Sequence, residues 1–71
     1  MITPEHLKNW FTYHAPDEMQ KVAYEELRNR GLDLAKAIVD LCPDSADTTA
    51  AVRLVRQAVM TANSAIACGG N

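Results

Sequence analysis

Residues 10–16 form the part of this sequence with the most evident chemistry, since they hold three of the four aromatic residues of the chain. Flat rings of this kind either fill a hydrophobic core or stack on a planar ligand. The simpler interpretation is that Trp10 and Phe11 pack the end of a small core. The functional interpretation is that Tyr13, together with His14, offers a stacking face to a planar ligand.

Two arginines form the second candidate, because each directly follows an apolar residue of a helical pattern. Arg28 comes after Leu27 and Arg56 comes after Val55, so both are expected at the edge of a packed face. Arginine in that setting holds a phosphate or carboxylate in a bidentate fork, or stacks on an aromatic ring. For any single cation of this chain, a solvated surface position is the simpler interpretation.

The sequence offers no arrangement that is typical of catalysis or of metal binding. His6 and His14 have no further ligand at metal spacing, and neither a nucleophile–base pair nor a phosphate-binding glycine loop occurs. The carboxylates are expected to serve as helix caps and solvated surface. We therefore expect a binding protein rather than an enzyme, with no metal and no cofactor.

Three helices are expected to position these residues, in an all-α fold. Thr3 is the expected N-cap of a short first helix with proline at its first position, and Pro43 ends the second helix. The predicted helices span residues 4–10, residues 16–41, and a third segment that follows a cap at Asp44 or Ser45 and ends before Gly69 and Gly70.

The apolar spacing of the two long helices predicts an antiparallel hairpin with apolar surface left over. The second helix carries a heptad-like series consisting of Tyr24, Leu27, Gly31, Leu34, Ile38 and Leu41. The third carries two stripes, Val52, Val55, Val59, Ala62 and Ile66, and beside them Ala51, Leu54, Ala58 and Ala65. One partner helix needs only one stripe, so we expect a homo-oligomer. Gly31 either permits a close approach of helices or is merely tolerated.

Size and charge narrow the function classes further. With 71 residues the chain is expected to form a single helical oligomerising domain, residues 1–71, with a thin core. Its net charge of −2 implies no general attraction to DNA or to an anionic membrane. No apolar run approaches the length of a membrane span, and a cytoplasmic location is expected.

The two cysteines are expected to remain free thiols. Cys42 and Cys68 lie at opposite ends of a predicted helix roughly 34 Å long, whereas a disulfide requires Cα atoms within about 7 Å. We expect Cys42 to be packed and Cys68 to lie on a fraying helix end. The same helical rise places Arg28 roughly 18 Å from Pro16. Tyr13 and Arg28 of one chain can therefore hardly hold one small ligand, and a shared pocket would lie between chains.

Four segments closely resemble the family of phage anti-CBASS cyclic-oligonucleotide sponges. In order and spacing they are FTYHAP at 11–16, YEELR at 24–28, LCPDS at 41–45 and AVMTANSAIA at 58–67. The resemblance implies a helical homohexamer that sequesters second messengers of bacterial immunity without cleaving them, in the cytoplasm of the infected host. Cyclic dinucleotides such as cyclic GMP-AMP would lie between pairs of protomers, and cyclic trinucleotides such as cyclic tri-AMP in separate pockets near a three-fold axis.

The resemblance also implies roles for individual residues. Tyr13 matches the family tyrosine that stacks on bases, and Arg28 matches a basic residue, often lysine, that contacts phosphate. Because arginine offers a fork where lysine offers a point charge, the ligand preference of this chain can differ. His14 and Lys21 complete the predicted dinucleotide site. From chemistry alone, the predicted trinucleotide site consists of Arg53, Arg56 and Asn63.

Two other functions are alternatives to the sponge. One is a structural or protein-binding helical module of a phage, with no nucleotide ligand, for which Tyr13 would be dispensable. The other is a phosphodiesterase, which is supported only by the presence of carboxylates and would require a metal.

Overall fold

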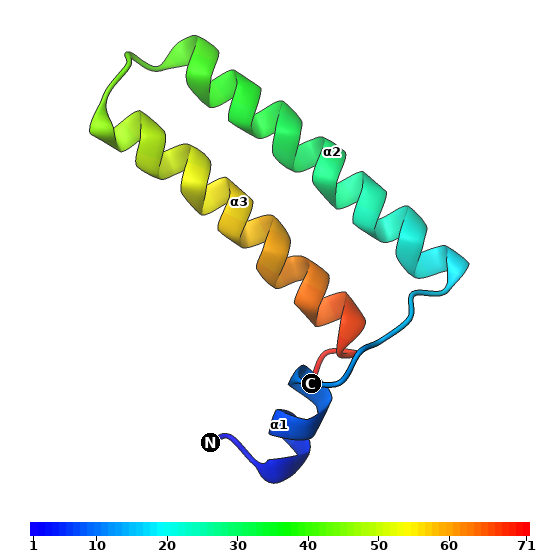
Figure 1. The fold of residues 1–71 in the computed structure, drawn as a ribbon. Helices are drawn as coiled ribbons and strands as arrows, with labels where there is room; N and C mark the ends of the chain where they lie inside the picture. Colours follow the sequence, from blue (N-terminus) through cyan, green and yellow to red (C-terminus); the bar gives the residue numbers. More distant parts are fainter.

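Helices α1 (Pro4–Trp10), α2 (Glu18–Leu41) and α3 (Ala46–Ala67) make up the protein, with no strand (Figure 1). This computed structural model describes all 71 residues, Met1–Asn71. The two long helices lie side by side and antiparallel, and α1 lies beyond the open end of this hairpin, next to the last residues of the chain (Figure 1). The predicted all-α class, with a short first helix and a two-helix hairpin, is confirmed.

Reciprocal hydrogen bonds define where the first two helices begin. Thr3 Oγ1 accepts the backbone N–H of His6 at 3.1 Å, while His6 Nδ1 accepts the backbone N–H of Thr3. Asp17 Oδ1 accepts the N–H of Gln20 at 2.8 Å, and Gln20 Oε1 accepts the N–H of Asp17 at 3.0 Å. The second helix therefore begins at Glu18, and the predicted start at residue 16 is two residues too early, because Asp17 acts as the N-cap rather than as a first-turn residue.

The hairpin turn offered two possible caps, and Ser45 is the one used. Its Oγ accepts the backbone N–H of Thr48 at 3.2 Å, so α3 begins at Ala46. Cys42, the C-cap of α2, is exposed, and the predicted packing of this residue is wrong within the single chain. Cys68 is half-buried, and both cysteines are free thiols as predicted.

The most shielded side chains of the protein lie along the contact between α2 and α3, which we call the seam. On α3 the first predicted stripe is half-buried throughout, consisting of Val52, Val55, Val59, Ala62 and Ile66. On α2 the half-buried positions include Ala35 and Ile38, whereas Leu34 and Leu41 are exposed. The predicted heptad series is thus wrong at Leu34 and Leu41. A straight helix drifts by about 20° per heptad relative to a strict seven-residue repeat, which brings Ala35 rather than Leu34 to the seam.

Gly31 lies on the seam and faces Val59 of α3. A Cβ atom added at this position would come within 2.6 Å of Val59 Cγ2, which is closer than ordinary contact. The sequence left two interpretations open, and the structure favours the first: the absence of a side chain at Gly31 lets α3 approach α2.

Apolar side chains remain uncovered over much of the surface. None of the 71 residues is fully buried. Phe11 is 86% exposed and Trp10 is 45% exposed, so the predicted packing of Phe11 is wrong within the single chain. Leu54 and Ala58 of the second α3 stripe are also exposed. None of the three helices has the length and the hydropathy that a membrane-spanning segment requires.

Candidate functional site

Tyr13 lies on the connector between α1 and α2, which comprises residues 11–17. Its side chain is almost fully exposed to solvent. The side chain is 85% exposed and makes no hydrogen bond. The ring is therefore available for stacking without any prior rearrangement of its neighbours. This position agrees with the predicted role of Tyr13, which remains a prediction.

His14 is placed differently, since its ring is half-buried and faces α1. Its Nε2 lies 2.7 Å from the backbone carbonyl oxygen of Asn9. Because a carbonyl oxygen only accepts, Nε2 donates in this bond. The ring of His14 is thus engaged with the protein, whereas that of Tyr13 beside it is not.

Lys21 lies near the start of α2 and pairs with Glu18. Its Nζ is 3.1 Å from Glu18 Oε1, and both side chains are largely exposed. Exposed pairs of this kind contribute at most about 1 kcal/mol, so an arriving phosphate can compete for the ammonium group.

Arg28 and Arg56 share one hollow on the hairpin surface, which was not apparent from their separate assignments. The hollow has a volume of about 240 Å³, and the two arginines reach it from α2 and α3 respectively. Its floor is apolar and consists of Gly31, Leu32, Ala35, Val52, Val55, Val59 and Met60. The sequence did contain a signal for this proximity, because each arginine directly follows a seam residue.

Neither guanidinium of this pair is engaged in an ion pair. The two ion pairs of the protein are Lys21–Glu18 and Arg30–Glu26. Arg30 Nε lies 2.7 Å from Glu26 Oε1, and this hydrogen bond, with the carboxylate charge, raises the pKa of Arg30 above its ordinary value. Arg30 is therefore already satisfied by the chain, whereas Arg28 and Arg56 can each take an external anion.

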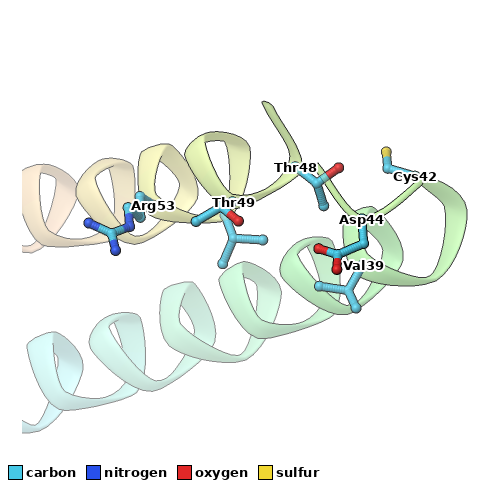
Figure 2. Close-up of a pocket in the computed structure, with 7 residues that line it drawn as sticks. Val39, Cys42, Asp44, Thr48, Thr49 and Arg53 are labelled. Atoms are coloured by element: carbon cyan, nitrogen blue, oxygen red, sulfur yellow. The ribbon is translucent and has the colours of Figure 1, made fainter. Parts of the chain in front are cut away.

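The three residues of the predicted trinucleotide site do not share a hollow within one chain. Arg53 lines a cavity of about 370 Å³ at the turn end of the hairpin, together with Val39, Cys42, Asp44, Thr48, Thr49 and Val52. Figure 2 shows Cys42, Asp44 and Thr48 near the turn, with Thr49 and then Arg53 further along α3. Arg56 lines the hollow of Arg28 instead.

Asn63 has a feature of its own on α3. Its Oδ1 is buried and has no hydrogen-bond partner in the chain. Leaving a buried acceptor unsatisfied costs about 1–3 kcal/mol. Because the chain itself shields this oxygen from solvent, the structure shows no open approach to it for a ligand.

An apolar hollow of about 480 Å³ lies on the other flank of the seam. It shares Gly31, Val55 and Val59 with the arginine hollow, and its other lining residues are Leu27, Arg30, Leu34, Leu54, Ala58 and Ala62. These include part of the second α3 stripe. The two flanks thus differ in character: one carries two unpaired cations, and the other is almost wholly apolar.

Fold and surface together define a small helical-hairpin protein with an exposed aromatic ring on its connector and two cations free of ion pairs on its hairpin. No three His, Cys, Asp or Glu side chains come together as a metal site.

Residues 3–67 match the family model described as the Acb2/Tad1 hairpin domain. Since this match covers most of the chain, the protein belongs to the Acb2/Tad1 family of anti-CBASS sponges, as the resemblance predicted. Sequestration of cyclic nucleotides is the general activity of this family, and its domain is a non-enzymatic, sponge-type domain. Neither the curated proteins nor the solved structures contain a match to this chain.

Proposed function

We propose that this protein sequesters cyclic dinucleotides between two of its own chains, with Tyr13 of one chain stacking on a base and Arg28 and Arg56 of another holding phosphate. The observation that carries the proposal is the pair of unpaired guanidinium groups at one apolar-floored hollow. That combination suits a nucleotide, since its phosphate is anionic while the faces of its bases are apolar. In this proposal Arg56 contributes to the dinucleotide site, and not to the trinucleotide site for which the sequence predicted it.

The helix geometry favours a pocket between chains. Arg28 lies ten positions after Glu18 on α2, which corresponds to roughly 15 Å along the helix axis. Tyr13 precedes Glu18 on the connector, so the ring and the arginines of one chain are far apart relative to a single nucleotide. A cyclic dinucleotide has approximate two-fold symmetry, and a two-fold pair of chains supplies each tyrosine and each arginine twice.

The expected interaction energies suffice for capture. Two stacked bases and two charge-assisted phosphate contacts together give about 5–12 kcal/mol in favourable contacts. The loss of ligand freedom offsets part of this gain. A Kd of 1 μM corresponds to about 8 kcal/mol, so micromolar or tighter binding requires contact energies near the upper end of that range. The second arginine adds a further charge-assisted contact to this sum. Sequestration requires no chemical step beyond binding.

Self-association is part of the proposal, because the single chain leaves too much apolar surface uncovered. Large exposed apolar patches mark interaction sites in soluble proteins. The apolar flank with Leu34, Leu54 and Ala58 is suited to cover a second copy of itself. The homohexamer implied by the resemblance is the assembly that we propose.

Cyclic trinucleotides such as cyclic tri-AMP are the second ligand class of the proposal. Arg53 supports it as an exposed cation without an ion-pair partner in the single chain, and Asn63 is the other residue proposed for this site. These two residues would have to come from different chains, in agreement with a site near a three-fold axis. The proposed place of action is the cytoplasm of the infected bacterium.

Titration calorimetry with cyclic GMP-AMP and with cyclic tri-AMP tests the proposal. We expect both to bind, and we expect intact cyclic nucleotide to be recovered after the complex is denatured by heat. Linear dinucleotide of the same bases serves as the control and should bind more weakly. Absence of binding to both cyclic classes would refute the proposal, and recovery of linear product would replace it with a phosphodiesterase.

Tyr13→Ala and Arg28→Ala test the site itself. Each should weaken the binding of cyclic GMP-AMP by about 10-fold or more, from the loss of one stacking or charge-assisted contact per half-ligand. Light scattering should show an unchanged oligomer. If either variant binds like the parent, the residue in question is not part of the pocket.

A further inference from the structure

The connector that carries Tyr13 is held by the carbonyl end of α1, through the residues on both sides of the tyrosine. The backbone N–H of Thr12 donates to Asn9 O at 3.4 Å, and its hydroxyl donates to Lys8 O. His14 Nε2 donates to the same Asn9 oxygen at 2.7 Å. The last carbonyl groups of a helix have no partner within the helix, and the connector uses them as acceptors.

Asn9 also attaches this unit to the end of α3. Its Nδ2 donates to Cys68 O at 3.0 Å, and the Cys68 thiol lies 4.0 Å from Asn9 O. Trp10 adds a second bond, from Nε1 to Asn71 O at 3.0 Å. Only α2 and α3 pack on each other along their length, so these polar contacts determine where α1 and the connector lie.

Tyr13 combines a held backbone with a free ring, and this combination suits a stacking residue. Ordering a loop or side chain at the moment of binding reduces affinity, whereas a group held in place beforehand avoids that loss. We infer that Asn9 and His14 are positioning residues, which hold the connector so that the ring of Tyr13 is presented to a nucleobase. The inference rests on the proposed function, in which Tyr13 stacks.

The hydrogen bond of His14 allows a matched set of variants. Nε2 must carry a hydrogen in order to donate to Asn9 O. Glutamine places its amide nitrogen at a similar reach and can donate the same bond. Asparagine offers the same amide group but is one methylene shorter. His14→Gln should therefore retain the contact, while His14→Asn and His14→Ala should lose it.

The first measurement needs no ligand. ¹⁵N relaxation of the Tyr13 amide in the full-length protein should give an order parameter of about 0.85 in the parent and in His14→Gln, and below about 0.6 in His14→Ala and His14→Asn. Asn9→Ala, which keeps the backbone carbonyl at position 9, should also lower the order parameters of α1, because the bond to Cys68 O is lost. Circular dichroism checks that α2 and α3 remain folded in every variant.

The second measurement is the affinity for cyclic GMP-AMP. His14→Ala, His14→Asn and Asn9→Ala should each weaken binding by about 2- to 10-fold, the loss expected when one segment must be ordered on binding. His14→Gln should bind like the parent. If the identity of the side chain at position 14 mattered for another reason than this hydrogen bond, His14→Gln should bind as weakly as the other variants.

The two measurements separate failure of the inference from failure of the proposed function. The inference is refuted if the order parameter of the Tyr13 amide is unchanged in His14→Ala and the order parameters of α1 are unchanged in Asn9→Ala. It is also refuted if a reduced order parameter is accompanied by parental affinity for cyclic GMP-AMP. If the order parameter falls but the parent protein binds no cyclic nucleotide, the proposed function is refuted, and the assignment of these residues to ligand binding is refuted with it.

Discussion

Replacing Gly31 with alanine sets two opposing effects of known size against each other. Alanine in place of glycine inside a helix ordinarily stabilises by about 1 kcal/mol. At this position the new Cβ would lie 2.6 Å from Val59 Cγ2 and 3.9 Å from Val55 Cγ1. Valine in a helix is nearly restricted to one χ1 rotamer, so Val59 cannot rotate its methyl group away without strain.

The steric effect is expected to dominate. Overpacking of this kind costs about 1–3 kcal/mol, so Gly31→Ala should lower the free energy of unfolding by up to about 2 kcal/mol after the gain in helix propensity. For a domain of this size each kcal/mol shifts Tm by about 4–8 °C. The midpoint of urea unfolding, followed by circular dichroism, measures the change. All variants should be compared at one protomer concentration, because the stability of an oligomer depends on concentration.

Val59→Ala provides the matched control. It removes the methyl group that the new Cβ meets, so in this background Gly31→Ala should stabilise the protein by about the full 1 kcal/mol of helix propensity. The reversal of sign between the two backgrounds is the expected result, and a double-mutant cycle gives its size. If Gly31→Ala stabilises equally in both backgrounds, the close approach of α2 and α3 at Gly31 is wrong.

The hollows and the helix caps give three further predictions. Arg56→Ala should weaken cyclic GMP-AMP binding by about 10-fold, and Arg56→Lys should weaken it by less. The Kd of the alanine variant should also depend less on salt concentration than that of the parent. Equal affinity of the parent and both variants would exclude Arg56 from the pocket. Ala58→Glu should dissociate the oligomer in light scattering, because it places a charge on the apolar flank. The control Lys36→Glu places the same carboxylate on exposed surface outside that flank and should leave the oligomer intact. Asp17→Ala should lower the free energy of unfolding by about 1 kcal/mol through loss of the N-cap, while Asp17→Asn should retain most of it in urea titrations.

Local sequence was sufficient to predict most of the secondary structure. The Thr3 cap and the stop at Pro43 act over a few residues, so they could be recognised without knowledge of the fold. The start of α2 differs by two residues from the predicted one, because two capping arrangements compete at this point. A helix starting at Pro16 was possible by proline geometry, but the reciprocal bonds between Asp17 and Gln20 satisfy two backbone groups at once.

The residue pattern also determined the family of this protein, because the four matching segments occur in order across most of the chain. Their order and spacing are properties of the sequence itself. The roles of Tyr13 and Arg28 remain predictions of that resemblance, to which the structure adds the exposure of the tyrosine ring and the unpaired state of the guanidinium.

Only the tertiary structure decided which residues of different helices meet. Arg28 and Arg56 line one hollow, and His14 turns toward Asn9 rather than outward with Tyr13. The first fact depends on how α2 and α3 are placed and rotated relative to each other, and the second on how the connector folds back onto the end of α1. For the hairpin that rotation is determined by packing at the seam, where Gly31 lets α3 approach and a helix of 3.6 residues per turn brings Ala35 inward in place of Leu34.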